Sequence, residues 1–154
     1  MSNSAWTTAQ PHGFTRHLGE DRTVGRTRFP RETALYTPPG WPREVRPPHA
    51  PDWEDSAARF LLDCSPPEYR TYPVLRRHVV VLARFAAEHV ESQLVACREG
   101  IAGVRASLGE FVSPDVLEAA TQTWQEQEAT LRRRRREVAL VEEALRGKVF
   151  IRKM

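Results

Sequence analysis

Apolar residues recur at steps of three and four along two long stretches in the second half of the chain. This spacing keeps side chains on one face of an α-helix. The first stretch places on that face Leu75, Val79, Leu82, Ala86, Val90, Leu94, Cys97, Ile101, Val104, Leu108 and Phe111. The second places Leu117, Ala120, Trp124, Gln127, Leu131, Arg134, Val138, Val141 and Leu145. The pattern predicts helices over about 73–111 and 114–146.

A short break at residues 112–114 separates the two stretches. Ser113 suits the N-cap position and Pro114 the first position of the second helix. Gly147 is a plausible stop at the other end of that helix. Helices joined by a short connection favour antiparallel neighbours. We therefore expect an all-α fold built on a long, coiled-coil-like antiparallel helical hairpin.

A third, shorter helix is predicted over 52–64, with Asp52 as its cap and Pro66-Pro67 after its end. Its apolar face consists of Trp53, Ala57, Phe60 and Leu61. A helix of this length is marginal by itself and must pack on something. The expected site is the open end of the hairpin, where Val74, Val81 and Phe85 form a second apolar flank.

Farther along the first long helix, that flank continues in small residues, namely Ser92, Ala96, Gly100 and Gly103. Small residues permit close approach, either by the paired helix or by a second subunit. Each glycine costs a helix interior about 1 kcal/mol relative to alanine, so a break near Gly100 is the alternative. The apolar spacing stays in phase on both sides of Gly100, which favours one continuous helix.

Residues 1–50 form an arginine- and proline-rich arm ahead of the helical domain at 51–147. The arm contains seven arginines and four acidic residues, so it accounts for the whole net charge of +3. Its prolines exclude helix and central strand, which predicts an extended, partly disordered segment. Trp41 either pins the arm to the hairpin or belongs to a linear motif, and the large area of its ring favours the first interpretation.

The basic and apolar tail at 148–154 follows the last predicted helix. Val149, Phe150 and Ile151 provide its apolar side chains. They either fold back on the open end of the hairpin or insert into a partner. The sequence leaves both alternatives open.

Five consecutive arginines, at 132–136, are the strongest candidate for a binding function. Five successive residues cover all sides of a helix. In an antiparallel hairpin, Arg134 lies opposite about residue 90, near Glu88 and Glu91, so the favoured interpretation is pairing with these acids and solvation of the rest. The alternative is an electropositive band that binds phosphate or an acidic protein. The candidate binding residues are Arg132, Arg133, Arg135, Arg136, Arg26, Arg28, Arg31 and Trp41.

The usual motifs of catalysis and cofactor binding are missing from the sequence. It contains no GxSxG, no glycine-rich phosphate loop and no HExxH, and Cys64 and Cys97 lack zinc-ligand spacing. We therefore expect no enzyme activity, cofactor or metal. No apolar run reaches the length of about 20 residues that spans a bilayer, and no signal-peptide core follows Met1. These features indicate a cytoplasmic protein without a membrane partner.

Taken together, the patterns favour a non-enzymatic interaction or adaptor protein that presents the hairpin and the arm to a larger assembly. Its partner is another protein or, through the small-residue flank, a second copy of the chain. One alternative is a nucleic-acid-associated protein that uses the arginine clusters. Another is a small regulatory subunit that covers part of an enzyme surface.

Overall fold

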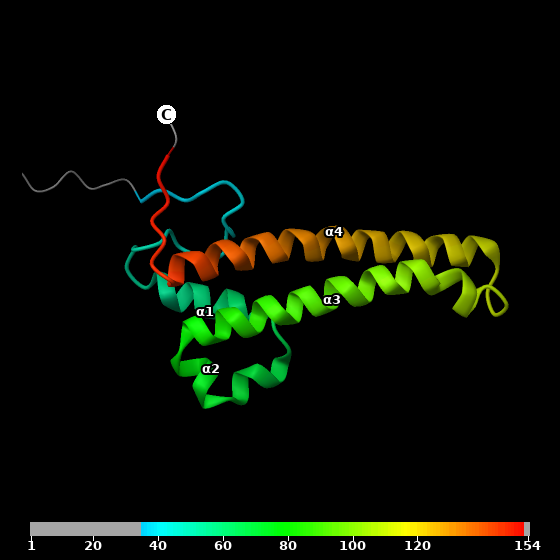
Figure 1. Cartoon of the computed structure of the whole chain (residues 1–154), viewed down its shortest axis with the longest axis horizontal. Helices are drawn as coiled ribbons and strands as arrows, with labels where there is room; N and C mark the ends of the chain where they lie inside the picture. Colours follow the sequence, from blue (N-terminus) through cyan, green and yellow to red (C-terminus); the bar gives the residue numbers. More distant parts are fainter. Residues whose placement is uncertain (1–34, 153–154) are drawn as a thin grey trace, which may run out of the picture. The chain divides into compact units, whose positions relative to one another are not determined.

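The computed structural model describes residues 35–152, and all regular secondary structure in this range is helical. The chain forms α1 (Trp53–Asp63), the 3-10 helix η1 (Pro67–Thr71), α2 (Pro73–Arg77), α3 (Val79–Leu108) and α4 (Pro114–Leu145). Helices α3 and α4 run side by side in opposite directions and are joined by one short turn (Figure 1). The predicted all-α hairpin is confirmed.

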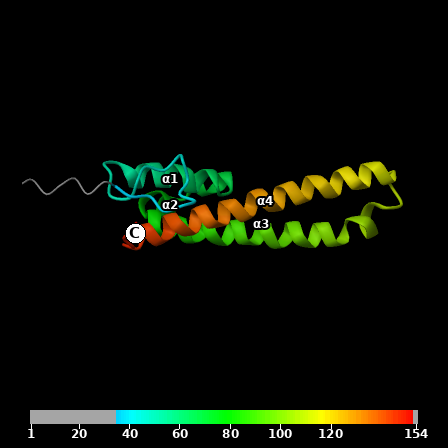
Figure 2. The ribbon, with the colours of Figure 1, turned by 90° about the horizontal axis from the view of Figure 1, so that it is seen from above.

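The main hydrophobic core lies at the open end of the hairpin, where α1 packs against α3 and α4 (Figure 2). There α1 contributes Ala57, Phe60 and Leu61 to the core, which α3 and α4 complete with Leu82, Ala83, Ala86, Val90, Val138, Val141 and Ala144. Toward the turn the two long helices bury much less, chiefly Leu94, Val104 and Leu117. The packing of the short N-terminal helix at the open end is therefore also confirmed.

The helix predicted over 73–111 is two helices that end earlier than expected. The backbone leaves the helical conformation at His78 (φ −124°, ψ 88°), which separates α2 from α3. No proline or glycine marks this point, and the apolar step from Leu75 to Val79 continues across it. At the other end α3 stops at Leu108, and Phe111, predicted on the apolar face, is 81% exposed. The predicted continuity through Gly100 is confirmed.

Both predicted N-cap residues stand at the expected positions, but neither makes a capping bond with its side chain. Asp52 occupies the N-cap of α1 in a left-handed conformation (φ 58°) and makes no capping bond with its side chain. Ser113 occupies the N-cap position of α4 in an extended conformation, also without a side-chain capping bond, and Pro114 opens the helix as predicted. Gly147 is as predicted: it adopts a positive φ of 91°, and the Lys148 amide donates to the carbonyl of Glu143 at 3.0 Å.

The described part of the predicted arm lies on the helical domain. Pro42 and Val45 are buried, and Val45 belongs to the main core. The Trp41 indole Nε1 donates to the Val45 carbonyl at 2.9 Å, and its ring meets Phe150 of the tail edge to face, with centroids 6.1 Å apart. These contacts agree with the pinning interpretation of Trp41 and fold Phe150 of the tail back on the domain.

The chain from 35 to 52 has no helix or strand and runs over α1 and the C-terminal half of α4 in both ribbon views (Figures 1 and 2). Among the described helices, none has a stretch apolar enough and long enough to cross a lipid bilayer.

Candidate functional site

The arginine run on α4 is largely paired with carboxylates. Arg132 lies 2.6 Å from Glu128, and Arg135 lies 3.3 Å from Glu91 across the hairpin. Arg133 and Arg134 both approach Glu137, at 3.8 and 3.7 Å. The expected pairing with an acid near residue 90 therefore exists for Arg135. Glu88, the other acid expected to pair with the run, contacts Arg84 of its own helix instead.

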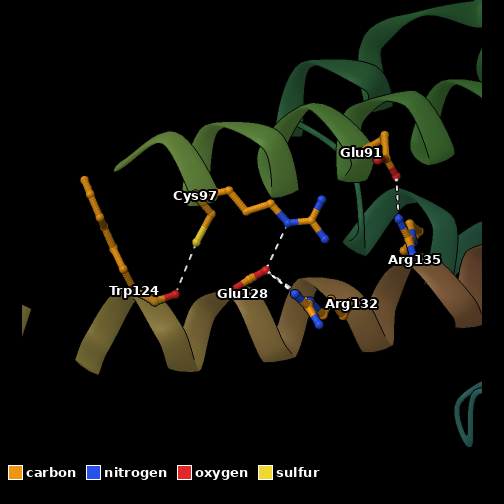
Figure 3. A network of polar contacts seen from close by, with 7 residues as sticks. Glu91, Cys97, Trp124, Glu128, Arg132 and Arg135 are labelled. Atoms are coloured by element: carbon orange, nitrogen blue, oxygen red, sulfur yellow. Dashed lines mark hydrogen bonds and ion pairs between the residues drawn. The ribbon is translucent and has the colours of Figure 1, made fainter. Parts of the chain in front are cut away.

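The middle of the hairpin is held by polar contacts between α3 and α4 (Figure 3). The Glu128 carboxylate accepts hydrogen bonds from Arg98 of α3 at 3.0 Å and from Arg132 at 2.6 Å. One turn away, the Cys97 thiol donates to the Trp124 carbonyl at 3.2 Å. The bond from Arg98, followed by that from Arg132, holds the pKa of the Glu128 carboxyl below its usual range.

Substituting Glu128 with glutamine is expected to destabilise the hairpin in a pH-dependent manner. A carboxyl whose pKa is lowered on folding stabilises the fold fully above its unfolded pKa, near 4.5, and loses this contribution as the pH falls through the folded pKa. The urea midpoint of Glu128→Gln should therefore lie below that of the wild type at pH 7, and the gap should close below pH 4.5. Glu118→Gln, at an exposed position of α4, is the control. A gap that is the same at pH 7 and pH 3 would contradict this assignment.

Cys64 and Arg134 meet where α1 ends. The Arg134 guanidinium lies over the ring of Phe60, 5.5 Å from its centroid, and its Nη1 is 3.9 Å from the Cys64 sulfur. Burial of the thiol outweighs the effect of the nearby Arg134 guanidinium and raises the pKa of Cys64 to about 11. The thiol is therefore protonated and unreactive at neutral pH.

Alkylation should show this directly in a Cys97→Ala variant, in which Cys64 is the sole cysteine. At pH 8 a thiol with a pKa of about 11 has about a hundredfold less thiolate than one at 9.0. Iodoacetamide should therefore modify Cys64 about a hundredfold more slowly in the folded protein than in guanidinium chloride. Rates within tenfold of each other would show that the site does not suppress the thiolate.

A cleft separates the 40–44 turn from α4, and three members of the arginine run line it. Arg133, Arg134 and Arg136 line it on the α4 side, and Trp41 and Arg43 line the opposite side. The structure thus brings three of the predicted candidates together at this cleft, Arg133, Arg136 and Trp41. Arg132 and Arg135 do not line it and contact Glu128 and Glu91 instead. The predicted candidates Arg26, Arg28 and Arg31 lie outside the described residues.

The predicted apolar flank of α2 and α3 is not covered by α1, contrary to the expectation. Val74, Val81 and Phe85 are 51%, 37% and 46% exposed. On α3, the residues that share the main core with α1 are instead Leu82, Ala83 and Ala86. Within residues 35–152 the flank is therefore left exposed.

Two aromatic rings extend this exposed flank, Tyr69 in η1 and Tyr72 directly after it. The Tyr69 ring meets Phe85 edge to face at 5.7 Å between centroids, and Tyr72 in the same manner at 6.4 Å. Tyr72 is itself 52% exposed. We call Tyr69, Tyr72, Val74, Val81 and Phe85 together the open-end face. Two tyrosines in a short linker were the one signal of this face in the sequence, and no period placed them beside Phe85.

Among the described residues, no group of three or more histidine, cysteine, aspartate or glutamate side chains could hold a metal ion. No model of a known protein family matches the chain. Comparisons with curated proteins and with solved structures likewise find no significant match. The function of the chain is therefore inferred from its own geometry.

Proposed function

We propose that this chain is a non-enzymatic interaction protein that binds a protein partner through the open-end face. The observation that carries the proposal is the exposure of four large side chains: Tyr72 and Phe85, whose rings both meet that of Tyr69, Val81, one turn before Phe85 on α3, and Val74 of α2. Scattered exposed apolar residues are normal on protein surfaces, but a contiguous group with aromatic rings is typical of a binding surface. Phenylalanine and tyrosine are also enriched at protein–protein interfaces.

The surroundings of the open-end face fit a protein partner. Arg76, Arg77 and His78, which lie between Val74 and Val81 in the sequence, are exposed. An apolar centre with a charged rim is the usual anatomy of a protein interface, and a basic rim complements acidic residues on the partner. The apolar centre supplies affinity, and the rim supplies orientation.

The charge pattern supports a protein rather than a nucleic acid as the partner. Binding to a nucleic acid through the arginine run requires guanidinium groups that are free to replace counterions on phosphates. Arg132 and Arg135 are instead engaged by Glu128 and Glu91, and Arg133 and Arg134 share Glu137. A regulatory subunit that covers an enzyme surface is one form of the proposed protein interaction.

The double variant Val81→Asp/Phe85→Asp tests the proposal. Both side chains are exposed, so the variant should keep its helical circular dichroism and melt within a few degrees of the wild type. A partner captured from lysate by the wild-type protein should be absent or at least about tenfold reduced with this variant, because two charges oppose burial of the face.

Ala102→Asp/Ala106→Asp is the matched control. It places the same two charges at the same spacing on exposed positions of α3, away from the open-end face. This control should retain the partner. Equal capture by both double variants would refute the open-end face as the binding surface, and loss with both would assign the effect to charge alone.

A further inference from the structure

The cleft between the 40–44 turn and α4 is suited to a small anionic group. It has a volume of about 610 Å³, within the range of about 300–1,000 Å³ that ligand pockets occupy. Two segments that are some 90 residues apart in the sequence form its walls. Arg43 and Glu44 come from one wall, and Arg133, Arg136 and Glu137 come from the other.

The charges in this cleft do not balance. Four guanidinium groups line it, those of Arg43, Arg133, Arg134 and Arg136, against the carboxylates of Glu44 and Glu137. Glu137 is shared by Arg133 and Arg134 at 3.8 and 3.7 Å. In the described part of the chain, neither Arg43 nor Arg136 has a carboxylate within ion-pair distance. Within residues 35–152, two positive charges on facing walls are therefore without a carboxylate partner.

Both walls are held in place by the fold. Gly40 turns the chain with a φ of 86° where it passes Leu140 of α4. The following residues are fixed by the Trp41 bond to Val45 and by burial of Pro42 and Val45, so the position of Arg43 is defined. On α4, Arg133 and Arg136 are three residues apart and point to the same side of the helix.

We propose that this cleft binds a phosphate monoester. A monoester carries between about 1.5 and 2 negative charges at pH 7 and offers three acceptor oxygens, which matches two unbalanced guanidinium charges on separate walls. A carboxylate carries one charge and is satisfied by a single bidentate arginine. The phosphate belongs either to a small phosphorylated molecule or to a phosphorylated side chain of a protein. The cleft shares no residue with the open-end face, so the two proposals can fail independently.

Nuclear magnetic resonance of the tryptophan indoles in the full-length protein tests this proposal. The chain has four tryptophans, and Trp41 lines the cleft whereas Trp124 lies in the middle of the hairpin. Titration with inorganic phosphate, against sodium chloride at equal ionic strength, should shift the Trp41 indole resonance saturably and leave that of Trp124 unchanged. A phosphoserine peptide and its unphosphorylated form provide the second arm.

Arg43→Ala and Arg136→Ala should each weaken binding at least about tenfold, since each removes charge-assisted hydrogen bonds to the phosphate. Arg105→Ala, at an exposed position on α3, should leave binding unchanged. Tighter binding of the phosphoserine peptide than of phosphate would identify a phosphoprotein as the ligand, and equal binding would identify a small phosphorylated molecule.

Three results would overturn the proposal. The first is a Trp41 shift that is linear in phosphate or equal in chloride. The second is binding that survives the double variant Arg43→Ala/Arg136→Ala in a folded protein. The third is tighter binding of a single-stranded oligonucleotide without a terminal phosphate, which would favour phosphodiesters over the monoester.

Discussion

Leu61→Ala is expected to lower the free energy of unfolding by about 2–5 kcal/mol, the largest effect of a single substitution that we predict. Leu61 is fully buried in α1 and belongs to the core that α1 forms with α3 and α4. Truncation removes the burial of its apolar atoms and leaves a cavity that the surrounding helices can fill only in part. Urea denaturation followed by circular dichroism measures the change.

Leu108→Ala is the matched control, since the chemical change is the same. Leu108 is the last residue of α3 and is 38% exposed, so truncation there should cost less than about 1 kcal/mol. The pair tests whether stability is concentrated at the open end of the hairpin. Equal losses in the two variants would show that the core extends evenly along both long helices.

Gly100→Ala and Gly103→Ala are expected to change stability in opposite directions. Alanine favours a helix interior over glycine by about 1 kcal/mol at either position. A β-carbon at position 100, however, would overlap the ring of Trp124, whereas one at position 103 would have no neighbour within 4 Å. Moving a packed ring costs about 1–3 kcal/mol, which exceeds the gain. Gly103→Ala should therefore stabilise the protein by about 0.5–1 kcal/mol, and Gly100→Ala should destabilise it by up to about 2 kcal/mol.

Thermal unfolding of the two variants at equal concentration distinguishes these outcomes. Gly100→Ala in a Trp124→Ala background provides the control, because without the ring the alanine should again be favourable. Stabilisation by Gly100→Ala in the presence of Trp124 would show that the ring does not rest on the glycine. This packing also accounts for one residue of the small-residue flank, since the paired helix of the same chain uses Gly100. Self-association through Ala96 and Gly103 stays a prediction.

The hairpin was predictable because its evidence is periodic and local. Steps of three and four define both long helices, Pro114 separates them, and Gly147 ends the second. Once the helices are antiparallel, their register follows from the turn, and that register brings Arg135 to Glu91. Such features can be predicted from the spacing of apolar residues along each helix and the position of a single turn.

The break at His78 was not predictable from the same evidence. Helix periodicity reports only which face of a helix is apolar. Leu75 lies before the break and still belongs to the main core, so the apolar spacing continues across the break. The choice between two apolar flanks for α1 was similarly undetermined. Both flanks have the right spacing, and α1 packs on the one that offers Ala83 and Ala86, whose small side chains permit close approach.

The cleft depends on a part of the chain that has no period at all. Residues 35–52 contain turns and prolines but no helix or strand, so no spacing rule places Arg43 near Arg136. Its position follows from burial of Pro42 and Val45, which is a property of the folded domain. The candidate arginines were thus recognisable in the sequence, but their division into paired and unpaired groups required the tertiary structure.

Site-specific photo-crosslinking from position 85 tests the central claim most directly, namely that the open-end face, which is exposed within residues 35–152, binds a protein. A photoreactive phenylalanine analogue at Phe85, in the cells that normally produce the protein, should crosslink to one defined polypeptide. The same analogue at Ala106, exposed on the same helix, should give none of that product. Crosslinking from position 85 only to α1 of the same chain, or equally from both positions, would contradict the claim.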